Sequence, residues 1–231
     1  MIFKKLIKGE KMSRDEKIIK DAQNLYGQGE WSKAIELLDM LLTTHDKEEV
    51  AEANRIRGWC YYYLGIKGDE SKKNENLEKA KEHFELSLAG GKKNETKISA
   101  LNGLVLSLWI LGKKEEAKLE SFKATEKFPQ EPSIWNTKAI LYRWANDWKV
   151  SVKICERVYE TAIEKKDFRT AGHSKHNRAD ALKELGKLDE AKKDYQESLK
   201  LYKKYQKKSG ESAKFHIDKV EEKISNLRIL N

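Results

Sequence analysis

The sequence predicts an all-α protein built as an array of helical hairpins. Three observations support this prediction: the 231 residues include only 2 Pro and 13 Gly, 37% of the residues are charged, and a short pattern centred on a turn residue recurs along the chain. Few turn formers and many charged residues favour exposed helix faces over strands. Because 39% of the residues are hydrophobic, the chain can also bury a core, which argues against wholesale disorder.

The recurring pattern is a glycine or asparagine that is followed five residues later by a small residue, with one copy displaced by an insertion. Its turn residues are Gly29, Gly65, Gly112, Asn146 and Gly186. A helix that ends through a left-handed residue prefers Gly, and Asn is the next choice. Each copy is therefore expected to form a helix–turn–helix unit.

With these turns and small residues, the chain resembles the tetratricopeptide repeat family. The fullest copies are residues 98–131 and 132–165. The residues in them that match family positions are Gly112, Ala117, Ala124, Pro129, Trp135, Ala139 and Tyr142. Lys138 and Ser121 depart from the Leu and Phe of the family pattern. The resemblance implies a right-handed α-solenoid of about five helical hairpins.

The repeats are expected within residues 15–208, preceded by a basic amphipathic segment at 1–14 and followed by a capping helix at 211–231. The individual units are expected at about 15–48, 51–92, 98–131, 132–165 and 172–208. The last segment has apolar residues at largely helical spacing, and a repeat array needs such a helix to cover its final apolar surface.

The net charge of +9 lies mostly in residues 1–14 and 196–231, which leaves the repeat body nearly neutral. A surface that follows nucleic-acid phosphates needs clustered Lys and Arg, so no dedicated nucleic-acid surface is expected on the repeats. No run approaches the ~20 apolar residues of a membrane span. Cys60 and Cys155 fit neither a disulfide framework nor a metal site. These features favour a cytoplasmic protein.

In the family, the first helix of each repeat lines a concave groove, and residues three or four apart share that face. The predicted peptide groove consists of Tyr26, Arg55, Trp59, Tyr62, Tyr63, Asn102, Trp109, Asn136, Arg143, Trp144 and His176. For Trp59, Trp109 and Trp144, groove contact and packing between helices are equal alternatives. Asn102 and Asn136 occupy equivalent positions and could hydrogen-bond an extended peptide. The remaining tryptophans, Trp31, Trp135 and Trp148, are expected to pack between helices.

The family's best-known chemistry is a clamp for the two carboxylates of a C-terminal peptide, made by Lys, Asn and Arg side chains. The matching positions hold Ile19, Gln23, Ser99 and Gly103, so that specificity is not expected.

His173 and His176, with Asp180 one turn further on, could share a metal ion. We favour a polar face exposed to solvent, because no fourth ligand accompanies them. No phosphate-binding loop, nucleophile elbow or spaced acid pair occurs. The sequence therefore predicts no catalysis, no metal and no cofactor.

The predicted function is a non-catalytic adaptor or scaffold that binds a peptide or helix of another protein. One alternative is a peripheral adaptor that the basic termini tether weakly to an anionic membrane or to ribosomal RNA. Another is a structural, self-assembling repeat protein. The sequence leaves the oligomeric state open.

Overall fold

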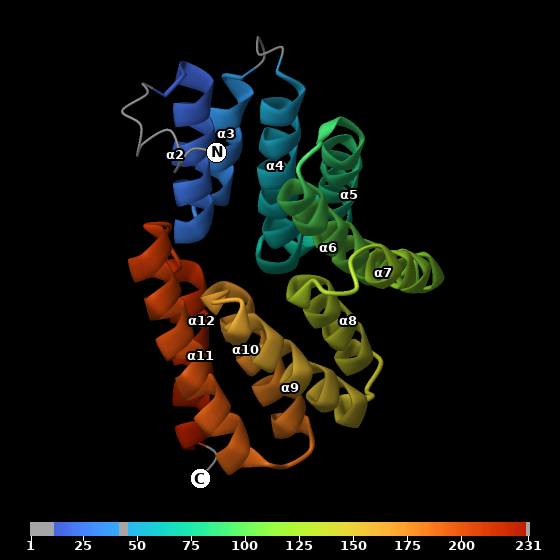
Figure 1. Ribbon diagram of the computed structural model, residues 1–231, viewed down its shortest axis with the longest axis vertical. Coiled ribbons are helices and arrows are strands. Elements are labelled where there is room, and N and C mark those ends of the chain that lie inside the picture. Colours follow the sequence, from blue (N-terminus) through green and yellow to red (C-terminus); the bar gives the residue numbers. More distant parts are fainter. Residues whose placement is uncertain (1–11, 42–45, 230–231) are drawn as a thin grey trace. The chain divides into compact units, whose positions relative to one another are not determined.

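The computed structural model describes residues 12–41 and 46–229 (Figure 1). Of these residues, 85% are helical and none forms a strand. The helices, in chain order, are α2 (Arg14–Gln28), α3 (Trp31–Asp39), α4 (Lys47–Lys67), the 3₁₀ turn η1 (Glu70–Lys72), α5 (Lys73–Gly90), α6 (Asn94–Ile110), α7 (Lys114–Lys127), α8 (Pro132–Trp144), α9 (Trp148–Glu164), α10 (Phe168–Glu184), α11 (Leu188–Ser209) and α12 (Lys214–Ile229). The all-α prediction is confirmed.

The helices divide into two compact units. Unit 1 spans residues 1–113 and unit 2 spans residues 114–231. The boundary falls between α6 and α7, inside the third predicted repeat at 98–131. The repeat limits expected from the sequence stay a prediction.

Within each unit, each helix packs against its neighbours in the chain, and α2 with α4, α4 with α6, and α8 with α10 also make contact. In unit 1, α4 contacts α5 and also α2 and α6; in unit 2, α10 contacts α9 and α11 and also α8. The last helix, α12, packs on α11. This alternation is the local packing of an α-solenoid, in which each repeat contacts only its neighbours.

The predicted turns are left-handed in four of the five copies. Gly29, Gly112, Asn146 and Gly186 all have positive φ angles, between 63° and 86°. Gly65 is different, because α4 continues through it to Lys67. A Cβ at Gly65 would lie 2.9 Å from Cγ of Leu77 on α5, so this glycine permits close helix packing rather than a turn. The prediction of a turn at Gly65 is wrong for that reason.

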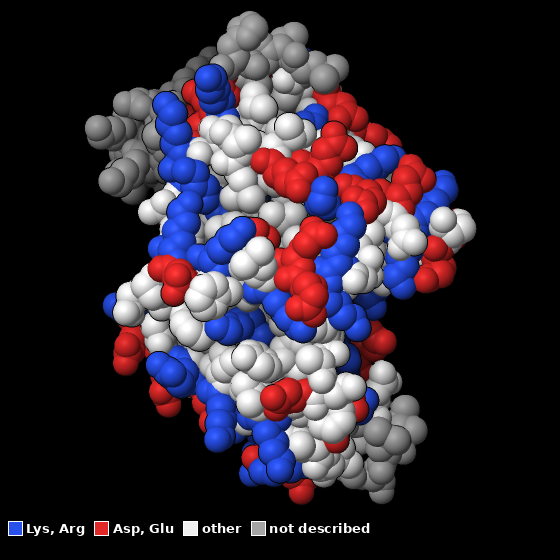
Figure 2. All heavy atoms as spheres, turned by 90° about the vertical axis from the view of Figure 1, so that its right-hand side faces the viewer, with Lys and Arg blue, Asp and Glu red and all other residues white. Residues whose placement is uncertain are grey.

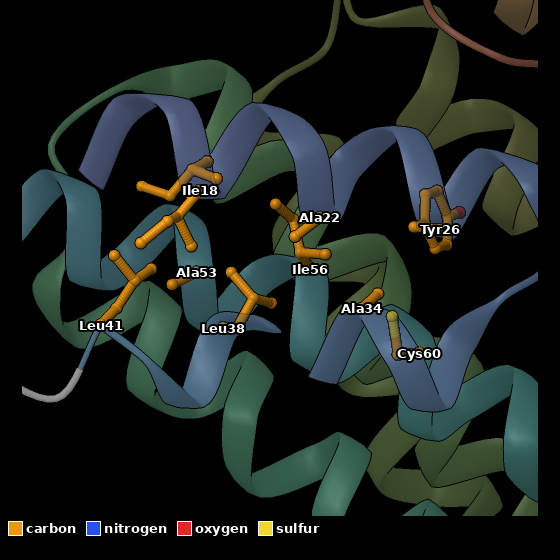
Figure 3. Packing of buried hydrophobic residues seen from close by; sticks show 10 residues of the cluster. Ile18, Ala22, Tyr26, Ala34, Leu38, Leu41, Ala53, Ile56 and Cys60 are labelled. Atoms are coloured by element: carbon orange, nitrogen blue, oxygen red, sulfur yellow. The ribbon is translucent and has the colours of Figure 1, made fainter. Parts of the chain in front are cut away.

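The small residues of the recurring pattern let helices approach each other closely. Ala34, Ala80, Ala117, Ser151 and Ala191 are all fully buried. In unit 1, Ala22, Ala34 and Ala53 bring α2, α3 and α4 together around Leu38 and Ile56 (Figure 3). Larger side chains at these alanines would force the helices apart, which explains why the pattern requires small residues.

The aromatic ring of Phe84, on α5, fills the junction of α4, α5 and α6. Phe84 is fully buried. A Cβ at Gly58 of α4 would lie 2.6 Å from this ring, and one at Gly103 of α6 would lie 2.1 Å from it. The absence of a side chain at Gly58 and Gly103 therefore leaves the space that the ring of Phe84 occupies.

The core of unit 2 continues onto its last helix. Val220, Ile224 and Leu227 of α12 are buried against Tyr195 and Tyr202 of α11. These are three of the five apolar residues whose spacing predicts the terminal helix; the other two, Phe215 and Ile217, are half-buried. Its role as a cap of the array stays a prediction.

Each unit contains one buried, free cysteine, Cys60 in unit 1 and Cys155 in unit 2. Burial raises the pKa of each thiol to about 12. Both side chains therefore pack as small apolar groups, and neither is a reactive thiol in the folded protein.

Candidate peptide-binding faces

Three successive first helices of unit 1 place their polar side chains on one face. On α4, Arg55 donates from Nη2 to Oε1 of Gln23 on α2 at 2.7 Å, and from Nη1 to Oγ of Ser99 on α6 at 3.4 Å. We call the surface formed by Gln23, Glu52, Arg55, Trp59 and Ser99 face 1. Helical spacing predicts that the residues on each helix lie on one face of that helix. In the structure, hydrogen bonds join these faces of α2, α4 and α6.

Glu52 holds Arg55 in position on face 1. The Nη2 atom of Arg55 donates to Oε1 of Glu52 at 2.6 Å, and Thr96 donates its hydroxyl to Oε2 of Glu52 at 3.2 Å. Burial by itself would raise the pKa of Glu52, but the charge and hydrogen bonds of Arg55 and the bond from Thr96 hold that pKa below its ordinary value. The ion pair is therefore maintained at neutral pH.

Trp59 contributes both to face 1 and to the packing beneath it. Its indole N–H donates to Oγ of Ser99 at 3.0 Å, and its ring lies edge-on to Phe84 with centroids 5.3 Å apart. Tyr63 stacks on Trp31 of α3, at 5.3 Å between centroids, so it packs between helices. Tyr26 and Tyr62, also predicted for the groove, are buried.

The two predicted groove residues of α6 differ in burial. Asn102 is buried and Trp109 is half-buried. The Oδ1 atom of Asn102 has no hydrogen-bond partner within the described part of the chain. Asn102 belongs to unit 1 and Asn136 to unit 2, so their joint action on a peptide stays a prediction.

Asn136 of α8 pairs with a residue that the sequence did not single out. The Nδ2 atom of Asn177 on α10 donates to Oδ1 of Asn136 at 3.2 Å. Asn177 directly follows His176, one of the predicted groove residues. An offset of one residue in the expected rotation of α10 explains why Asn177 was missed.

A second face is built around Asp180 in unit 2. Its Oδ2 atom lies 3.1 Å from Nη1 of Arg143 on α8, and its Oδ1 atom lies 3.3 Å from Nζ of Lys223 on α12. Tyr195 donates its hydroxyl to Oδ1 at 2.5 Å. We call the surface formed by Arg143, Asp180 and Lys223 face 2. Trp144, the neighbour of Arg143 in the sequence, is half-buried at the end of α8.

The carboxyl group of Asp180 stays ionised despite its burial. Burial raises its pKa, but His176, Arg143, Lys223 and the hydrogen bond from Tyr195 together lower the pKa below the ordinary value. Lys223 lies on the terminal helix, which the sequence suggested only as a cap.

Three histidines of α10 and α12 lie near one another, and His176 also lies 3.7 Å from Oδ2 of Asp180. The rings of His173 and His216 meet edge-to-face at 4.7 Å, and Nδ1 of His173 lies 2.8 Å from the hydroxyl of Tyr202. His176 packs edge-on against Tyr195 at 5.7 Å. Burial, followed by nearby cations, lowers the pKa of all three histidines, although Asp180 opposes this effect at His176.

The expectation of a solvated polar face is wrong for His176 and Asp180. Both side chains are buried, because Tyr195 of α11 packs against His176 and donates to Asp180, and Lys223 of α12 pairs with Asp180. Among the described residues, no group of three or more His, Cys, Asp or Glu side chains is arranged to hold a metal ion.

The positions that would match the family's carboxylate clamp take part in packing and in face 1. Ile19 belongs to the core of unit 1, and Gly103 accommodates the ring of Phe84. Gln23 and Ser99 bind Arg55. The residues present therefore differ from that clamp both in type and in local role.

The basic C-terminal segment is partly engaged by its own unit. Lys204 and Lys208 of α11 lie over the ring of Phe168, and Lys203 lies 3.7 Å from a carboxylate oxygen of Glu221. Figure 2 shows basic and acidic side chains intermixed over the face in view. The basic segment at residues 1–11 lies outside the described residues. None of the helices described has the length and apolar composition needed to cross a membrane.

Comparison with known proteins identifies one repeat directly. Residues 174–205, in α10 and α11, match the tetratricopeptide repeat family. Among solved structures, one named MamA AMB-1 is similar, with 16% sequence identity, coverage of 79% of this chain and 96% of that chain, and a TM-score of 0.42. The comparison with curated proteins gives no match.

Proposed function

We propose that this chain, whose residues 174–205 match the tetratricopeptide repeat family, is a non-catalytic adaptor that binds a peptide or helix of another protein. Repeat arrays of this kind offer extended surfaces on which successive helices contribute contacts to one ligand. The proposal places the adaptor in the cytoplasm, in keeping with the two free cysteines.

The observation that supports this proposal best is the arrangement of face 1. Arg55 is bonded to residues on α2 and α6, so its side chain and those of Gln23 and Ser99 are already ordered. A ligand that binds an ordered surface pays less conformational entropy. Arg and Trp also contribute much of the binding energy in typical interfaces, and Arg55 and Trp59 both donate to Oγ of Ser99 on this face.

A peptide library tests the adaptor proposal. Random peptides displayed on phage would be selected on the full-length protein, and the affinity of the enriched peptides would be measured in solution. We expect Trp109→Ala to weaken binding by about 2 kcal/mol, or roughly thirty-fold, because a half-buried tryptophan at the end of α6 offers a large contact area. Failure to enrich any peptide would contradict the adaptor proposal.

Trp135→Ala is the matched control for this substitution. Trp135 is also half-buried, but its indole N–H donates to the carbonyl of Pro129 at 2.8 Å and its ring lies under Lys138, so its contacts are made close by in the sequence. Affinity should be unchanged in this variant. Thermal unfolding of both variants is measured in parallel. If Trp109→Ala costs ~3–5 kcal/mol of stability and leaves affinity intact, Trp109 is a packing residue.

A further inference from the structure

The first turn of α12 is held by a cluster of three rings, one from each of three helices of unit 2. His216 of α12 stacks on Tyr202 of α11, with ring centroids 5.2 Å apart, and meets His173 of α10 edge-to-face at 4.7 Å. The hydroxyl of Tyr202, which is the titratable group of α11 in this cluster, lies 2.8 Å from Nδ1 of His173. Two of the three rings therefore belong to histidine, the side chain that ordinarily gains its proton between pH 7 and pH 5.

This cluster disfavours protonation while α12 is in place. The centroids of His173 and His216 are 4.7 Å apart, so protonation of both rings would bring two like charges together. Burial is the main cause that lowers the pKa of these two histidines. Three further side chains lower the pKa of both rings: Arg169 and His176 of α10 and Lys219 of α12. The closed cluster is therefore a neutral one.

The later turns of α12 are held by contacts that mild acid leaves intact. Three of their apolar side chains are buried, namely Val220, Ile224 and Leu227. The Nζ atom of Lys223 lies 3.3 Å from Oδ1 of Asp180, and the pKa of this carboxyl lies below its ordinary value, so the pair is still charged at pH 5. Acid thus acts on the contacts of residues 214–219 and spares those of residues 220–229.

We propose that residues 214–219 of α12 form an acid-sensitive latch, which opens when His173 and His216 gain protons and closes when they lose them. The open latch exposes the rings of His173 and Tyr202 to water, while residues 220–229 stay packed on α11. Unit 2 thereby offers an aromatic surface in mild acid that it hides at neutral pH. The inference does not rest on the adaptor function, because it concerns only contacts within unit 2.

Proton linkage sets the expected size of the effect. In the open latch each of the two histidines has a pKa near the ordinary value of about 6.5, whereas in the closed latch each ring stays neutral at pH 5. Between pH 7 and pH 5, each ring therefore shifts the equilibrium toward the open form by about 25-fold. Both rings together shift it by a factor on the order of several hundred.

Amide hydrogen exchange of the full-length protein, followed by NMR, tests the latch. The probes are the amides of residues 217–219, of which that of Ile217 donates to the carbonyl of Ala213 at 3.0 Å. Their protection factors, corrected for the intrinsic effect of pH on exchange, should fall on the order of several hundred-fold from pH 7 to pH 5. At pH 5 they should lie at least about tenfold below those of α9. Protection that is unchanged by pH, or equal to that of α9 at pH 5, would overturn the latch.

The variant His216→Phe separates the proton from the packing. A Phe ring keeps the stack on Tyr202 but cannot be protonated, so the fall in protection should shrink to about 25-fold, which is the contribution of His173. His216→Gln, which lacks the ring, should show the same smaller fall from its own value at pH 7. His83→Gln is the matched control and should retain the full fall, because burial also lowers the pKa of His83 but this residue lies on α5 of unit 1. A full fall in both His216 variants would overturn the proposal.

Discussion

Phe84→Ala is expected to lower the free energy of unfolding of unit 1 by about 3–5 kcal/mol. The ring is fully buried at the junction of α4, α5 and α6, and Gly58 and Gly103 leave a space that no other side chain can fill without moving a helix. Urea unfolding followed by circular dichroism measures the loss. Phe122→Ala is the matched control, because Phe122 on α7 is 55% exposed and its removal should change stability by less than about 0.5 kcal/mol.

The glycines on either side allow a sharper version of this experiment. Gly103→Ala would place a methyl group 2.1 Å from the ring, which should cost about 1–3 kcal/mol. Combined with Phe84→Leu, the same substitution should cost less than the sum of the two single effects, because the smaller side chain yields space to the new methyl. Strict additivity in this cycle would show that the ring and Gly103 do not compete for one space.

Acidification from pH 7 to pH 5 is expected to destabilise unit 2. The pKa of His173, His176 and His216 is lowered by burial in the folded protein, whereas in the unfolded chain each titrates near its ordinary value of about 6.5. Below that value the unfolded chain binds more protons, so stability is fully present above pH ~6.5 and is lost as the pH falls. For His176, which is 7% exposed, the loss by pH 5 is about 2 kcal/mol.

The variant His176→Gln isolates this contribution. Urea unfolding at several pH values should show a shallower decline for the variant than for the natural protein. The lowered pKa of Asp180 acts in a separate window, because a carboxylate with a depressed pKa loses its contribution only below pH ~4. Lys200→Gln, at an exposed site on α11, should retain the full decline. Identical slopes for His176→Gln and the natural protein would mean that His176 has the same pKa in the folded and unfolded states.

Local features of the fold could be predicted from the sequence, and features that depend on distant residues could not. Gly112, Asn146 and Gly186 were identified as turns because a left-handed conformation selects its residue type locally. Gly65 is the same residue type in the same pattern, but a glycine is needed there because Leu77 of α5 packs closely against it. No local signal distinguishes the two cases. The position of Phe84 between two glycines was missed for the same reason.

The candidate faces show the same division. Helical periodicity was enough to place Arg55 and Trp59 on one side of α4, because spacing of three and four defines a helix face. Their partner Ser99 lies on α6, and periodicity cannot choose it from the residues around it. On α10, the sequence predicts a solvated position for His176 and Asp180, because their burial depends on Tyr195 and Lys223, which come from later helices.

The two cysteines provide one natural reporter of local opening in each unit. Cys60 and Cys155 are both shielded from reagents, one in each unit, and neither thiol ionises near neutral pH. A thiol reagent can therefore modify each of them only when its own surroundings open. Mass spectrometry of the two cysteine-containing fragments from one labelling reaction would then measure the opening rates of the two units separately, without any engineered cysteine.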